Sequence, residues 1–95
     1  MADEVQEMEM TLRNKYGIHV RPAGLFAKIA SRHSSAITVT KDGNSVSGKS
    51  IMALLTLEAV CGSVLTVRAE GPDAEAALQD LAALVERKFD LPDEQ

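Results

Sequence analysis

The heptapeptide Gly17-Ile18-His19-Val20-Arg21-Pro22-Ala23 lies where a strand-like alternating run gives way to a run with helical spacing. Proline is favoured in the first turn of a helix, because it has no N–H group to leave unpaired there and its fixed φ suits the helix. His19 is therefore expected at or just before a helix start. The N–H groups of such a start, together with the positive end of the helix dipole, form an anion site.

His19 and Arg21 are the candidate reactive pair. A lone histidine in a short chain is more often a surface residue than a reactive one. Here Gly17 permits backbone conformations closed to other residues, Pro22 fixes the helix entry, and Arg21 adds a permanent positive charge. A neutral imidazole in this setting could carry a phosphoryl group on a ring nitrogen. Arg21 could then hold the phosphoryl oxygens by two hydrogen bonds.

The composition is that of an ordinary globular chain of 95 residues, with 45% hydrophobic and 25% charged residues. We expect one domain over residues 1–95, with an ordered core over about 6–90 between short acidic termini. The formal net charge is −4. This acidic balance argues against nucleic-acid binding, which needs a basic face.

Several site classes are not expected. An apolar stretch of about eighteen residues is absent, which excludes membrane insertion, and no signal peptide is apparent, so we expect a cytoplasmic protein. The single cysteine, Cys61, cannot form an internal disulfide, and the sequence assigns it no role. Neither histidine has a second ligand nearby in the sequence, so we expect no metal and no cofactor.

Alternating apolar and polar residues predict four strands. In the first, from Glu7, the residues Met8, Met10 and Leu12 share one face, and Met1–Val5 are expected to be frayed. The other three strands are expected over residues 37–40, 45–47 and 63–70. Asp42-Gly43 between two of these runs predicts a tight hairpin turn.

Three runs with helical spacing complete the pattern. They are expected from Ala23 to about residue 33, from Ile51 to about Leu57, and from Ala74 to Phe89, the longest. Four strands that are each apolar on one face need one covering layer, which helices supply. The expected fold is α+β: a four-stranded antiparallel sheet with helices on one face, in the order βαββαβα.

Two motifs carry a resemblance to a known family. Gly17–Ala23, followed about thirty residues later by Gly48-Lys49-Ser50-Ile51-Met52-Ala53-Leu54-Leu55, resembles HPr, the histidine-containing phosphocarrier family of the bacterial phosphotransferase system. The resemblance covers essentially the whole chain. Val20 departs mildly, since a small residue is common there. The resemblance implies an open-faced β-sandwich with two long helices and one short helix.

The resemblance also implies the site. His19 would be the phosphohistidine, reacting at Nδ1, and Arg21, Pro22 and Ala23 at the helix start would bind the phosphoryl group. The implied partners are enzyme I, which loads the carrier from phosphoenolpyruvate, and A-type enzyme II components, which serve sugar uptake or regulation. Such a protein is a carrier rather than an enzyme and uses no cofactor.

Ser50 and the short apolar helix form a second expected region. Ser50 is expected to cap that helix. The resemblance adds regulatory phosphorylation of Ser50 by a serine kinase, reversed by a phosphorylase, although Glu58 stands where the family has a small residue. Ile51, Met52 and Leu55 cannot all face inward if Leu54 and Leu57 do, so part of this set is expected to be exposed for partner docking.

Three other functions stay open at this point. A nitrogen-regulatory branch of the system uses an HPr-like carrier, and two segments weakly favour that branch: Asn14-Lys15-Tyr16-Gly17 and Ala53-Leu54-Leu55. A small-molecule-binding regulatory domain can have a similar order of elements, but it gives His19 and Arg21 no task. An acyl-phosphate hydrolase would need a residue to orient water, for which Asn44 is the candidate by type.

Overall fold

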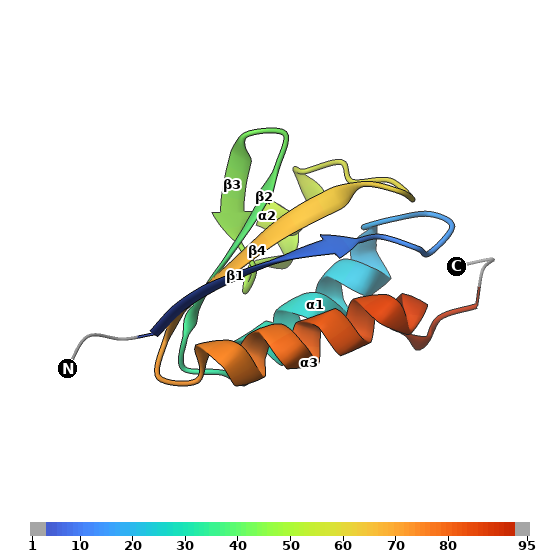
Figure 1. The fold of residues 1–95 in the computed structure, drawn as a ribbon. Coiled ribbons are helices and arrows are strands. Elements are labelled where there is room, and N and C mark those ends of the chain that lie inside the picture. The colour runs from blue at the N-terminus through green and yellow to red at the C-terminus, as the bar shows by residue number, and fades with distance from the viewer. Residues whose placement is uncertain (1–3, 93–95) are drawn as a thin grey trace.

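The computed structural model describes residues 4–92, and a four-stranded antiparallel sheet forms one layer of it (Figure 1). The strand order across the sheet is β1-β4-β2-β3. β4 is central: it pairs with β1 on one side and with β2 on the other. The strands are β1 (Glu4–Thr11), β2 (Ala36–Lys41), β3 (Asn44–Ser47) and β4 (Val64–Gly71).

The predicted alternation along the strands is confirmed. Met10 on β1 and Leu65, Val67 and Ala69 on β4 are buried, because successive side chains of a strand point to opposite faces. β1 starts earlier than expected, at Glu4 rather than Glu7. Of the residues predicted to be frayed, Glu4 and Val5 are held by pairing with Gly71 and Glu70 at the end of β4, and residues 1–3 lie outside the described part of the chain.

The turn between β2 and β3 has the predicted hairpin geometry. Asp42 has φ 51° and Gly43 has φ 83°, and the flanking residues Lys41 and Asn44 face each other in the ladder. Two successive left-handed residues give the turn that matches the twist of antiparallel strands. The Asp-Gly signal was therefore sufficient to locate this hairpin.

Three helices complete the fold, and the two long ones lie side by side on one face of the sheet (Figure 1). α3 packs against β1 and β4, and α1 contacts both α3 and the short helix α2. Phe26 of α1 and Leu78 and Leu81 of α3 are fully enclosed. The α+β open-faced sandwich is confirmed. The helices are α1 (Val20–Ser31), α2 (Ile51–Leu55) and α3 (Ala74–Glu86).

Two helix ends differ from the prediction. α2 stops at Leu55 rather than near Leu57. α3 stops at Glu86, so Phe89 is not part of its apolar stripe. Phe89 lies instead in a 3-10 turn, Lys88–Asp90, whose three residues all have positive φ. This left-handed turn redirects the chain and places the Phe89 ring, 1% exposed, in the core.

Within residues 4–92, none of the helices has the length and apolar character needed to cross a membrane. Over the same residues, no group of three or more His, Cys, Asp or Glu side chains is arranged to hold a metal ion.

Candidate functional site

His19 occupies the N-cap position of α1, directly before the first helical residue, Val20. Its backbone is extended, with φ −120° and ψ −168°, and its carbonyl accepts the N–H of Ala23 at 2.9 Å. The imidazole makes no capping hydrogen bond. The predicted position at a helix start is therefore correct, and the ring is not used to complete the helix.

A tight turn, Asn14–Gly17, lies just before His19 in the chain. The Gly17 N–H donates to the Asn14 carbonyl at 3.2 Å, and the Asn14 side-chain amide donates to the Gly17 carbonyl at 2.6 Å. Gly17 has φ +65° and lies against the backbone of Ala59 and Val60, where a Cβ atom would have no room. The next residue, Ile18, donates its N–H to the Ala59 carbonyl at 2.8 Å.

The two nitrogens of the His19 ring are in different surroundings. Among the residues that the structure describes, His19 Nε2 and Asn14 Oδ1 are the buried side-chain polar atoms without a hydrogen-bond partner. Leaving a buried polar atom unpaired costs about 1–3 kcal/mol. The Tyr16 ring lies beside the imidazole, with 6.3 Å between ring centroids and an interplanar angle of 83°.

The other residues of the motif divide into two groups. Arg21 is exposed in the first turn of α1, two residues after His19, and that turn contains no acidic residue. Pro22 and Ala23 are buried. Pro22 has no N–H group, and the N–H of Ala23 is bonded to the His19 carbonyl. Pro22 and Ala23 thus help to build the helix start, and their predicted contact with a phosphoryl group stays a prediction.

α2 lies next to the N-terminal half of α1. Ser50 is its N-cap, and Ser50 Oγ accepts the N–H of Ala53 at 3.1 Å, as the capping prediction required. Ile51 is 42% exposed and Met52 is 75% exposed, whereas Leu55 is half-buried and packs against the core. Part of the set is therefore exposed, as the sequence predicted. Burial of Leu54 and Leu57 turns Ile51 and Met52 outward.

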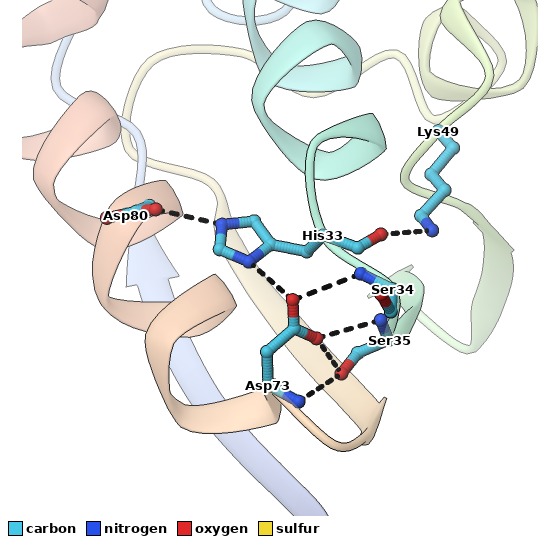
Figure 2. Close-up of polar contacts among 6 residues, drawn as sticks. All are labelled: His33, Ser34, Ser35, Lys49, Asp73 and Asp80. Atoms are coloured by element: carbon cyan, nitrogen blue, oxygen red, sulfur yellow. Dashed lines mark hydrogen bonds and ion pairs between the residues drawn. The ribbon is translucent and has the colours of Figure 1, made fainter.

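The second histidine, His33, belongs to a polar cluster just after α1 (Figure 2). Its Nδ1 lies 2.9 Å from Asp73 Oδ2, and its Nε2 lies 2.8 Å from Asp80 Oδ2. Carboxylate oxygens only accept hydrogen bonds, so a doubly protonated ring satisfies both contacts. The His33 carbonyl accepts Lys49 Nζ at 2.9 Å. The sequence predicted a structural or solvent-facing histidine, and the structural role is the one observed.

Asp73 ties the start of α3 to the loop after α1 (Figure 2). Its carboxylate accepts the hydroxyl of Ser35 and the backbone N–H groups of Ser34 and Ser35, the latter two at 3.0 and 2.9 Å. These bonds, the Ser35 hydroxyl first among them, hold the pKa of Asp73 well below its ordinary range, although partial burial opposes the shift. Asp73 occupies the predicted N-cap position, but its side chain bonds across to another loop instead of capping α3.

The sequence analysis missed two residues near His19, because it gave Asn14 and Tyr16 no part in the site. The available signals were an asparagine three residues before a glycine, which favours a closed turn, and an aromatic residue directly before that glycine. Cys61, for which the sequence assigned no role, is a free, exposed cysteine.

Comparison with known proteins agrees with the two motifs. The family model described as "PTS HPr component phosphorylation site" matches residues 6–87. The phosphocarrier protein HPr of Borreliella burgdorferi is 49% identical over 78 residues, which cover 82% of this chain and 91% of the relative. The phosphocarrier protein NPr of Shewanella violacea is 39% identical over 84 residues, covering 88% and 92%. The crystal structure of HPr-C-His from Thermoanaerobacter tengcongensis matches with a TM-score of 0.88 and 42% identity, covering 92% of this chain and 98% of that one.

Proposed function

The chain belongs to the HPr family of phosphotransferase-system phosphocarrier proteins, and on that premise we propose that His19 accepts a phosphoryl group from enzyme I and passes it to A-type enzyme II components. The observation that carries the proposal is the placement of His19 as the N-cap of α1 with an imidazole that caps nothing. A phosphoryl group on that ring would lie at the positive end of the helix dipole.

Arg21 and the helix start would stabilise the phosphoryl group after transfer. Arg21 is exposed within two residues of His19, and a guanidinium can bind two phosphoryl oxygens at once. The backbone N–H groups of Val20 and Arg21, the first two helical residues, are the nearest candidates for further bonds. A carrier must release its cargo, so an exposed arginine and a helix end suit the task better than an enclosed pocket.

A docking surface adjoins the site. We define the apolar rim as Val20, Ile51 and Met52, which are 65%, 42% and 75% exposed. α1 and α2 are in contact, and Gly24 of α1 lies opposite the end of the Ile51 side chain. Exposed apolar side chains beside a reactive group favour binding of a protein partner, and the flexible Met52 suits a surface that must fit several partners. We assign the rim to enzyme I and to A-type enzyme II components.

Ser50 lies directly before two residues of this rim. Phosphorylation by a serine kinase would place about two negative charges there, which would oppose docking of a partner on the rim. The hydroxyl already accepts the Ala53 N–H, so capping of α2 is sufficient to explain the residue. Regulation through Ser50 is therefore the secondary part of the proposal.

Service to the nitrogen-regulatory branch is the second candidate function, because the NPr of Shewanella violacea is among the relatives. Loading by the enzyme I of each branch, compared at equal concentrations, separates the two. Preference for the nitrogen-branch enzyme I would move the assignment to that branch. The two remaining alternatives, a small-molecule sensor and an acyl-phosphate hydrolase, gain no support from family membership.

The direct test is phosphoenolpyruvate-dependent loading by enzyme I, followed by intact mass and acid lability of the adduct. We expect stoichiometric loading of the wild type, no loading of His19→Ala, and loading of His33→Gln, the matched control on the only other histidine. Arg21→Lys should load and transfer more slowly, because lysine cannot reproduce the two parallel bonds. Full, acid-labile loading of His19→Ala would refute the proposal.

A further inference from the structure

The Tyr16 ring is the aromatic neighbour of the proposed phosphohistidine. The two rings meet nearly at right angles, with centroids 6.3 Å apart, a favoured geometry for aromatic pairs. Tyr16 is 49% exposed, and the ammonium group of Lys15 lies 5.2 Å from the centroid of the same ring. Tyr16 therefore lies at the surface near both the Lys15 ammonium group and the His19 imidazole.

The backbone holds Tyr16 in this place. It lies inside the Asn14–Gly17 turn, which is closed by one backbone bond and by the buried Asn14 amide. Gly17 seats that turn against Ala59 and Val60. A closed turn that is fixed to another loop gives the Tyr16 side chain a defined direction, so its contact with His19 follows from the fold.

The imidazole lies with Nε2 enclosed and without a hydrogen-bond partner. A ring free to rotate about its χ2 bond could present either nitrogen to a phosphoryl donor. We propose that Tyr16 is a positioning residue that blocks this rotation, keeps Nε2 inside, and so restricts phosphoryl transfer to Nδ1. This inference rests on the proposed function of His19.

The Nδ1 lone pair of the neutral ring forms the new N–P bond, while the bond between phosphorus and the donor breaks and its electron pair leaves with the donor. The proton on Nε2 stays on the ring. If the ring turned over and its proton moved to Nδ1, the Nε2 lone pair would form the N–P bond and the product would be the other phosphohistidine isomer.

The experiment compares the isomers formed on His19 in the wild type, Tyr16→Phe and Tyr16→Ala. The probe is phosphoramidate, a small donor that phosphorylates imidazole without docking on the protein. Nitrogen-15 and phosphorus-31 NMR identify which ring nitrogen carries phosphorus, and the resonances of His19 and His33 are read separately. A purely structural role of Tyr16 would change the stability of the protein without changing this ratio.

We expect the Nδ1 isomer in the wild type and in Tyr16→Phe, which keeps the ring. In Tyr16→Ala the proportion of the Nε2 isomer should rise roughly 3- to 10-fold, the range that loss of one aromatic contact predicts. Tyr16→Leu keeps an apolar side chain without a ring, should show the same rise, and replaces Tyr16→Ala if that variant does not fold. An unchanged ratio in the folded ring-deleted variant, or a wild type in which the two isomers form in similar amounts, would overturn the inference.

The two proposals fail separately. Absence of loading by enzyme I would defeat the proposed function and leave the phosphoramidate ratio as a valid test of ring orientation. Normal loading by enzyme I together with an unchanged isomer ratio in Tyr16→Ala would defeat only the role of Tyr16.

Discussion

Replacing Gly17 with alanine tests the link between the turn and the site. Gly17 and Gly43 both have left-handed backbones, with φ +65° and +83°. An L-residue in this conformation costs about 1–2 kcal/mol. A Cβ atom on Gly43 would meet nothing within 4 Å, whereas one on Gly17 would lie 2.7 Å from Val60 Cα. Gly43→Ala is therefore the matched control, since it carries the backbone cost without the collision.

The collision at Gly17 is with backbone atoms, so the two segments must move apart. The bond from the Ile18 N–H to the Ala59 carbonyl spans this contact, and its loss costs about 1 kcal/mol. With the backbone cost, Gly17→Ala should lower the free energy of unfolding by roughly 2–3 kcal/mol, against about 1–2 kcal/mol for Gly43→Ala. For a chain of this size, 3 kcal/mol lowers the melting temperature by roughly 12–24 °C.

Two assays read the outcome. Urea unfolding followed by far-ultraviolet circular dichroism measures stability, and loading by enzyme I, corrected for the folded fraction, measures the position of His19. Displacing the turn should slow loading of Gly17→Ala on the order of 10- to 100-fold and leave Gly43→Ala at the wild-type rate. Equal losses of stability in the two variants, or unchanged loading of Gly17→Ala, would refute the claim that this contact positions His19.

Three further predictions concern other residues. Because the pKa of Asp73 is lowered in the folded state, the stabilisation it provides is complete above its unfolded pKa and is lost as pH falls toward the folded pKa. As the pH falls below about 4, the free energy of unfolding from urea titrations should therefore decrease less in Asp73→Asn than in the wild type. An equal decrease in the two proteins would contradict this. Glu58 has φ 51°, a conformation that strains any residue except glycine. Glu58→Gly removes this strain but adds entropy to the unfolded chain, so it should raise the free energy of unfolding by about 0.5–1 kcal/mol. A lower free energy of unfolding in Glu58→Gly would argue against strain at this position. Ser50→Asp keeps a capping side chain and should weaken enzyme I binding, whereas Ser50→Ala should cost about 1 kcal/mol of stability and keep the affinity; undiminished affinity of Ser50→Asp would place docking elsewhere.

The local pattern of the chain was enough to predict most of the fold. The first strand is marked by the alternation of Met8, Met10 and Leu12, and the hairpin by the turn residues Asp42-Gly43. The last helix is marked by apolar residues at helical spacing: Ala74, Ala77, Leu78 and Leu81. Each signal operates over a few residues, so it can be read without knowing what packs against it. Pro22 likewise placed His19 at a helix start, because its missing N–H and fixed φ are properties of the residue itself.

Contacts between distant segments could not be predicted in this way. His33 meets Asp73 across a separation of 40 residues, and the sequence contains no mark of that pairing. Phe89 enters the core through a left-handed turn that its helical spacing did not predict. Both arrangements depend on where α1 and α3 come to rest on the sheet.

The local sequence pattern thus determined which segments are strands and helices and where the His19 imidazole lies along the chain. Only tertiary packing decided how that imidazole is oriented, because Nε2 is enclosed by the folded protein and the turn that carries Tyr16 is seated on the loop at Ala59 and Val60. The physical reason is range: backbone preferences act between neighbours, whereas the surroundings of a ring nitrogen depend on segments that meet only when the sheet and helices have assembled.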